Sequence, residues 1–284
     1  MKNILLTSVA ILAMLFGSCR KDTGFAPVKV HVNGFAISQE EFSFKTAQDV
    51  ADYNDVNAVT LAFYKADGTE AYKTTQTKNE ADFGEFSLSL PMGTYTMVAV
   101  AYYNSDASPL ELTSPTVAAY TGTRAYETFA ATQEVMISNT NAVDISATLD
   151  RVVTQLKVVS TDGKTADVSN VRMTFSAGGK DFNPSTGLTI TNTGFANTVG
   201  NSAAVGATST SLSFLFLATD EQNMNVTIET LDADGNTLFS KTVNNVPFKR
   251  NRVTKLTGAM YTNTSTTGSF QVNTDWLTEE NVSF

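Results

Sequence analysis

The feature that most constrains this 284-residue sequence is the alternation of apolar and polar residues with a period of two. Phe86–Leu90 alternates strictly, Pro91–Gly93 follows as a turn, and Thr94–Tyr103 is rich in β-branched and aromatic residues. Such alternation places every second side chain on the same face of a strand, whereas an amphipathic helix repeats every 3.6 residues. Long stretches with the helical repeat are absent, so the sequence predicts an all-β fold made of antiparallel β-sandwiches.

Asp-Gly pairs between apolar runs predict hairpin turns at Asp67-Gly68 and Asp234-Gly235, and Asp162-Gly163 predicts a third turn. The segment Asp232–Asn236 also has the composition of a calcium-binding loop. In an EF-hand, the twelfth position of that loop is a bidentate glutamate, and here it is Val243. The turn is therefore the favoured interpretation.

Short helical turns are expected within two segments, Ala47–Tyr53 and Ala125–Thr132.

An internal repeat predicts two domains. Asp55–Phe63 aligns without gaps with Asp167–Phe175, 112 residues later, and Phe86–Tyr103 echoes Leu212–Leu231 less closely. Structural units that recur along a chain leave such self-similarity in its sequence.

The boundary between the two domains is predicted from a change of phase. Val143, Ile145, Ala147 and Leu149 are apolar at odd positions, whereas the apolar set after Asp150-Arg151 includes the even positions Val152, Leu156 and Val158. A shift of one residue exchanges the buried and exposed faces of a strand. We therefore expect domains at residues 19–150 and 151–284. A bulge within one continuous sheet is the alternative.

The first eighteen residues have the pattern of a secretory signal. Lys2 gives a positive start, Ile4–Phe16 is mostly apolar, and the small residues Gly17 and Ser18 precede Cys19. This segment resembles a bacterial lipobox, in which cleavage after Ser18 makes Cys19 the first residue and its thiol carries diacylglycerol. The resemblance implies a surface lipoprotein of the cell outer membrane. A buried free cysteine beside an ordinary signal peptide is the alternative.

Composition argues against several classes of function. The net charge is −9, and no basic stripe of the kind that binds nucleic acid is present. One cysteine and one histidine leave no disulfide, no cysteine zinc site and no histidine cluster, so no metal, cofactor or catalytic residue is predicted. The acidic pairs Glu40-Glu41, Asp220-Glu221 and Glu279-Glu280 are interpreted as surface charge, because neighbours on a strand face opposite ways.

Three further motifs carry a resemblance to a known family. They are Leu90–Tyr95, Leu149–Val153 and Asn245–Gly258, the last reading NVPFKRNRVTKLTG. Together with the lipobox, their order and spacing resemble the Bacteroidetes fimbrillin-like proteins, which are subunits and anchors of type V pili. The resemblance covers the chain from about Cys19 onward. It implies two transthyretin-like β-sandwich domains, no catalysis, and assembly with other pilus subunits by strand exchange.

Strand exchange needs a donor strand and an acceptor. The C-terminal segment 270–284 is the candidate donor, with Phe270, Val272, Trp276 and Leu277 as its apolar side chains. An extended strand can add to an open sheet edge, where its alternate side chains fill pockets. Pairing of this segment within its own domain is the alternative. The candidate displaced strand carries Val28, Val30 and Val32, and His31 on it is expected to face solvent.

One departure concerns maturation. Shaft subunits of the family are cleaved after an arginine beyond the lipid site, but here Arg20 abuts Cys19 and the next arginine is Arg124. Lys29 and Lys45 would need a protease of wider specificity. This favours an anchor or accessory subunit that keeps its lipid.

A surface glycan-binding lipoprotein of a polysaccharide-uptake system is the alternative function. Its candidate aromatic residues are Tyr102, Tyr103, Tyr120, Tyr126 and Phe129. A pilus adhesin would combine both functions, with host or bacterial surface ligands as further partners.

Overall fold

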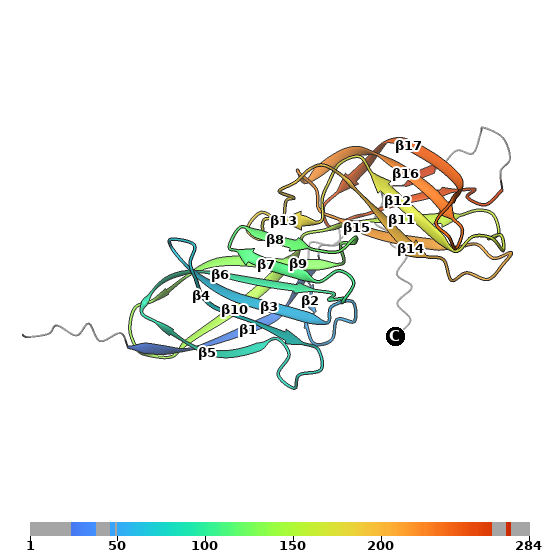
Figure 1. Ribbon diagram of the computed structural model, residues 1–284. Coiled ribbons are helices and arrows are strands. Elements are labelled where there is room, and N and C mark those ends of the chain that lie inside the picture. The colour runs from blue at the N-terminus through green and yellow to red at the C-terminus, as the bar shows by residue number, and fades with distance from the viewer. Residues whose placement is uncertain (1–23, 38–45, 49, 263–270, 274–284) are drawn as a thin grey trace, which may run out of the picture.

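The computed structural model describes residues 24–37, 46–48, 50–262 and 271–273. Within these residues the protein consists of β-strands joined by turns and loops, without an α-helix, which confirms the all-β prediction (Figure 1). Of the two predicted helical turns, the second is wrong, because most of Ala125–Thr132 belongs to β9, which spans Thr128–Ile137. In the first segment, Thr46–Gln48 forms strand β2 and Val50–Asp52 forms a turn. Accordingly, the described residues contain no helix suited to crossing a membrane.

The first half of the chain forms one eight-stranded sheet that folds into two layers around a core. The layers meet at the end of β10, where Asp150 pairs with Ala130 and Arg151 pairs with Phe129. One layer contains β5 (Glu85–Pro91), β1 (Phe25–Ile37) and β10 (Val143–Arg151), with β2 on the edge of β1. The other contains β9, β6 (Gly93–Tyr102), β3 (Ala58–Lys65) and β4 (Glu70–Thr77).

Strands β3 and β6 have a hydrophobic cluster on each face, so nearly all of their residues are buried. Odd-numbered side chains such as Leu61 and Met97 enter the core between the two layers. Even-numbered side chains such as Ala62 and Val98 enter a second cluster on the outer side. A small sheet covers that cluster, and its strands are β7 (Leu110–Ser114), β8 (Val117–Tyr120) and β13 (Asp181–Phe182).

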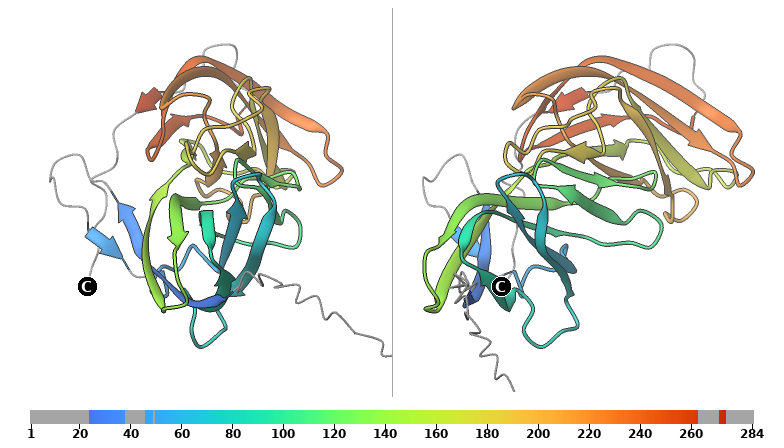
Figure 2. Two further views of the ribbon diagram at one scale, coloured as in Figure 1. Left: turned by 90° about the vertical axis from the view of Figure 1, so that its left-hand side faces the viewer. Right: turned by 60° about the vertical axis from the view of Figure 1, so that its left-hand side comes forward.

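The second half forms two four-stranded sheets that enclose their own core. One sheet has the order β15 (Thr210–Leu215), β11 (Thr154–Ser160), β18 (Val253–Gly258) and β19 (Gln271–Asn273). The other has the order β14 (Phe195–Gly200), β12 (Asn170–Phe175), β16 (Glu221–Leu231) and β17 (Thr237–Lys249). In both panels of Figure 2 these two sheets lie above the sheets of the first half.

The two halves repeat one strand order, which confirms the internal repeat. The layer β5-β1-β10 corresponds to β15-β11-β18, and β9-β6-β3-β4 corresponds to β17-β16-β12-β14. Ala58 and Asn170, which the sequence alignment places together, begin the equivalent strands β3 and β12. The expectation of antiparallel sheets needs one correction in each half, because β1 runs parallel to β10 and β11 runs parallel to β18. A parallel pair needs a long connection, and here most of each half lies between the two paired strands.

The change of phase expected at Asp150-Arg151 is present. Ile145, Ala147 and Leu149 of β10 are buried at odd positions, and Leu156 and Val158 of β11 at even positions. Between these strands the chain leaves one sheet and enters another.

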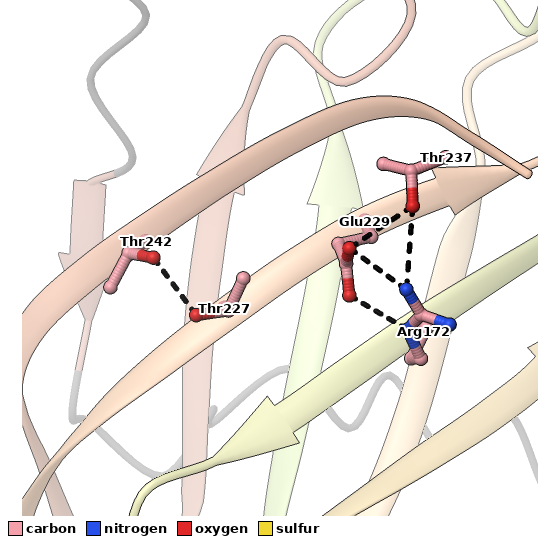
Figure 3. A network of polar contacts seen from close by, with 5 residues as sticks. All are labelled: Arg172, Thr227, Glu229, Thr237 and Thr242. Carbon is pink, nitrogen blue, oxygen red and sulfur yellow. Dashed lines mark hydrogen bonds and ion pairs between the residues drawn. The ribbon is translucent and has the colours of Figure 1, made fainter.

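The polar turns and outer faces carry local hydrogen bonds. The Asp232 carboxylate accepts bonds from the backbone of Asp234 (3.0 Å) and Asn236 (2.8 Å), which confirms the turn interpretation of this segment. On the outer face of the β12-β16-β17 sheet, Arg172 donates to both carboxylate oxygens of Glu229, at 2.7 and 2.9 Å (Figure 3). Hydrogen bonding to Glu229 raises the pKa of Arg172, and the same bonds lower the pKa of Glu229.

Candidate assembly interface

The strand nearest the N-terminus, β1, lies inside its sheet. It pairs with β5 on one side and with β10 on the other, so that Val28 lies between Leu88 and Val143, and Val30 lies between Phe86 and Ile145. The three predicted side chains, Val28, Val30 and Val32, are all buried, as is Ala26. Full burial of one such valine contributes about 1.5–3 kcal/mol. Loss of β1 would therefore uncover a long apolar groove.

His31 occupies the opposite face of β1. Its Nδ1 contacts a carboxylate oxygen of Glu85 on β5, and both side chains are substantially exposed. The expectation that His31 faces solvent is confirmed.

The C-terminal candidate donor is paired in part within its own chain. In β19, Val272 lies opposite Leu256 of β18, and Gln271 and Asn273 flank this pair. This is the alternative arrangement that the sequence left open. Phe270, Trp276 and Leu277 lie outside the described residues, as do the cleavage site at Ser18 and the lipidation site at Cys19.

Asp162 fixes the chain where it leaves β18. Its carboxylate accepts bonds from the backbone of Met260, Tyr261 and Thr262, each at 2.8 Å, and from the Thr262 hydroxyl at 2.9 Å. Burial alone would raise the pKa of Asp162, but these four bonds outweigh it and hold the pKa below its ordinary value. The sequence marked Asp162 only as a turn residue, because its partners lie about a hundred positions away.

The repeat reveals an open edge in the first half. The outer edge of β18 is covered by β19, whereas its counterpart β10 pairs on that side only through Asp150 and Arg151. Among the described residues, Val143–Leu149 therefore has no strand on this edge. Unpaired backbone groups at such an edge can accept a further strand.

Two of the sequence motifs meet at the junction of the halves. Arg151, from Leu149–Val153, donates a hydrogen bond of 3.0 Å to the side chain of Asn251, which belongs to Asn245–Gly258. The backbone NH of Asn251 donates to the carbonyl of Val153 at 2.8 Å. Asn251 has a φ of 56°, a conformation that asparagine tolerates better than most residues.

Arg151 also belongs to a buried polar cluster with Glu127 and Tyr53. Arg151 Nη2 lies 2.6 Å from Glu127 Oε1, and each side chain is only 10% exposed. The Tyr53 hydroxyl donates to Glu127 at 2.8 Å and accepts from Arg151 at 2.9 Å. Burial raises the pKa of Glu127, although Arg151 opposes the shift, and burial followed by the charge of Glu127 raises the pKa of Tyr53.

Sequence reasoning missed Tyr53 and Glu127. The available signal was Arg151 itself, because an arginine among apolar residues at a phase change requires a buried partner.

Aromatic packing also joins the halves. Phe182 and Phe216 of the second half stack with ring centroids 4.3 Å apart, in the same cluster as Tyr120 of the first half. Strand β13 pairs with β8, which places backbone hydrogen bonds across the junction. The two halves therefore share one packed interface.

Of the aromatic residues considered for glycan binding, Tyr102, Tyr120 and Phe129 are buried. Tyr103 is 41% exposed, and its ring centroid lies 5.2 Å from that of Tyr126. The Arg124 guanidinium lies 5.0 Å from the Tyr126 centroid. These three side chains form a small patch, the Tyr103 patch, with the stacking and cationic groups that a sugar platform uses.

Cavities and acidic groups offer little chemistry. A groove of about 470 Å³ between β3, β4 and β7 is lined by three threonines, two leucines, Lys73 and Glu111. In the described part of the chain, no cluster of three or more histidine, cysteine or acidic side chains could hold a metal ion. Asp220 and Glu221 form surface ion pairs with Arg250 and Lys249, whereas the other two acidic pairs lie outside the described residues.

These features define a β-sheet protein in two halves, each with its own core, and with an open sheet edge in the first half. Residues 34–283 match the model of the family of unknown function DUF6562, and the protein belongs to that family. The comparison with curated proteins found no match.

Solved structures share the fold at low sequence identity. A candidate adhesin from Bacteroides ovatus ATCC 8483 is 11% identical, with a TM-score of 0.51, and the match covers 84% of this chain and 88% of that one. The fimbrial anchor protein Mfa2 from Porphyromonas gingivalis is 11% identical, with a TM-score of 0.51 and coverages of 88% and 98%. A candidate polysaccharide-binding protein (DUF1812) from Bacteroides thetaiotaomicron VPI-5482 is 12% identical, with a TM-score of 0.51 and coverages of 90% and 99%. The predicted fimbrillin-like resemblance is thus confirmed for the fold.

Proposed function

We propose that this protein is a surface lipoprotein of the outer membrane that serves as a fimbrial anchor or accessory subunit. In this proposal cleavage after Ser18 exposes Cys19 for lipidation, and residues 19–150 and 151–284 form two transthyretin-like sandwich domains. The observation that carries the proposal is the interior position of β1. A lipid near its start is tied to the body of the protein by buried valines and by strand pairing on both sides.

The position of β1 also supports one direction of assembly. Displacement of β1 would require cutting the chain or unpairing it, and Lys29 is itself paired with both neighbours. We infer that β1 stays in place and that this chain donates its C-terminal segment to another pilus subunit. The short β19, which spans three residues, is the part of that segment that must leave β18.

Two experiments test the proposal. Palmitate labelling of cells should vanish in Cys19→Ala, and labelling that persists would end the lipoprotein assignment. Deletion of residues 270–284 should leave a folded monomer but abolish denaturant-resistant multimers with partner subunits. Val272→Asp is the matched point variant. Unfolding of the deleted chain would instead mean that the segment belongs only to its own sandwich.

Binding of glycans is a second candidate function, and the exposed Tyr103 patch is the observation that favours it. A glycan array should then show micromolar binding that Tyr103→Ala and Tyr126→Ala remove. Leu238→Ala, which changes a comparably exposed apolar side chain in the second half, is the control. Binding that survives both tyrosine substitutions would exclude this patch.

A further inference from the structure

Three segments without charged residues meet at one end of the first half. Gly24–Val28, Leu88–Val98 and Val135–Val143 contain no charged residue, although 17% of the whole chain is charged. We call the part of the surface that these segments form the uncharged end. In Figure 1 it lies at the left, where β1 begins and where β9 is connected to β10, and in the left panel of Figure 2 this side faces the viewer.

Strand pairing holds the three segments together. Phe25 pairs with Pro91, and Thr94 pairs with Met136. A Cβ added at Gly24 would clash with the Thr140 side chain, so the start of β1 lies against the connection between β9 and β10. The uncharged end is therefore one continuous part of the surface.

Large apolar side chains protrude from this end. Phe25 is 59% exposed, Met92 is 43% exposed and Met136 is 69% exposed. They come from three different strands or turns: Phe25 lies on the outer face of the β1 layer, and Met136 lies on that of the β6 layer. Exposed apolar groups at the same end of a protein are candidates for contact with a partner or a membrane.

The charges on the neighbouring β3–β4 hairpin balance one another. The β3–β4 hairpin beside this end carries Lys65, Asp67, Glu70 and Lys73, which have no net charge together. The chain as a whole has a net charge of −9, so an anionic surface repels most other approaches more strongly than an approach by this end.

The adjoining chain leads to the proposed lipid. Cys19 precedes Gly24 by five residues, which span at most about 18 Å when fully extended. Arg20 and Lys21 within that span can pair with lipid phosphates, and the span keeps a net charge of +1 when Asp22 is counted. On the strength of the proposed function, we infer that the uncharged end rests on the lipid bilayer. Phe25, Met92 and Met136 would insert among the headgroups and orient the protein with its second half away from the membrane.

Fluorescence quenching by lipid tests this orientation. The chain from Cys19 onward would carry Trp276→Phe, which removes its one tryptophan, and Met136→Trp as a reporter. Its Cys19 thiol would be coupled to maleimide lipid in phosphatidylcholine–phosphatidylglycerol vesicles with brominated acyl chains. The matched chain would carry Val205→Trp, because Val205 is 66% exposed in the second half.

We expect emission from residue 136 to fall by about twofold or more on vesicles and emission from residue 205 to stay unchanged. Met92→Asp should reduce the quenching at residue 136, and Val205→Asp should not. Equal quenching at both reporters, or none at residue 136, would overturn the inference and make a protein partner the next occupant to test. Because the tether is chemical, the result does not depend on whether the cell lipidates Cys19, which palmitate labelling tests separately.

Discussion

Replacement of Arg151 by methionine tests the buried cluster at the junction of the two halves. Met keeps much of the side-chain volume but leaves the Glu127 carboxylate, itself 10% exposed, without the cation 2.6 Å away. Removal of one partner from a buried ion pair costs about 3–5 kcal/mol. The substitution also removes the hydrogen bonds that Arg151 donates to Asn251 and Tyr53. We therefore expect Arg151→Met to lower the free energy of unfolding by an amount in this range at neutral pH.

The pH dependence separates this mechanism from a simple packing defect. Burial raises the pKa of Glu127 in the folded state, so its charged form lowers stability, and that cost disappears as the pH falls through the raised pKa. Arg151 opposes the shift, so Arg151→Met raises this pKa further. The destabilisation should consequently be largest at neutral pH and shrink as Glu127 becomes protonated.

Urea unfolding between pH 5 and pH 8 measures both effects as differences in the free energy of unfolding. Arg250→Met is the control, because its partner Asp220 is 68% exposed and such a pair contributes at most about 1 kcal/mol. The reasoning would be refuted if Arg151→Met lowered the free energy of unfolding no more than the control does. It would also be refuted if the decrease did not depend on pH.

Three further predictions concern the sheets and the chain ends. Asp162→Asn should lower the free energy of unfolding by about 1–3 kcal/mol at neutral pH. Because the folded-state pKa of Asp162 is lowered, this difference in the free energy of unfolding should vanish as the pH falls through that pKa, which urea unfolding at acidic pH measures. Val30→Ala should cost about 2–3 kcal/mol in urea unfolding, against less than about 0.5 kcal/mol for Lys29→Ala on the exposed face of β1. Arg172→Met should cost less than about 1 kcal/mol, and thermal scans should show this difference shrinking as salt is added.

Much of the fold could be predicted because alternation is a local property of the sequence. The same pattern gave the strand class, the repeat between β3 and β12, and the phase change at Asp150-Arg151. The parallel pairs could not be predicted, because β1 and β10 are more than a hundred residues apart and no local signal fixes their direction. The helical turn expected within Ala125–Thr132 was wrong because pairing with β6 stabilises β9 there as a strand.

The candidate sites were predictable to a smaller extent. Burial of Val28, Val30 and Val32 follows from alternation, but only the structure shows that β1 lies between two neighbours. The partners of Asp162 are distant in sequence, so no pattern revealed that cluster. For the Glu127 cluster, the sequence offered only Arg151 at the phase change. The uncharged end is visible in the sequence only after strand pairing brings its three segments together.

Electron cryomicroscopy of this protein assembled with its partner subunits tests the central claim most directly. The account predicts that residues 270–284 form an extended strand in the sheet of the neighbouring subunit, while β1 remains between β5 and β10. Density that shows residues 271–273 still paired with β18 of their own chain, or β1 replaced by a strand from another subunit, would contradict it.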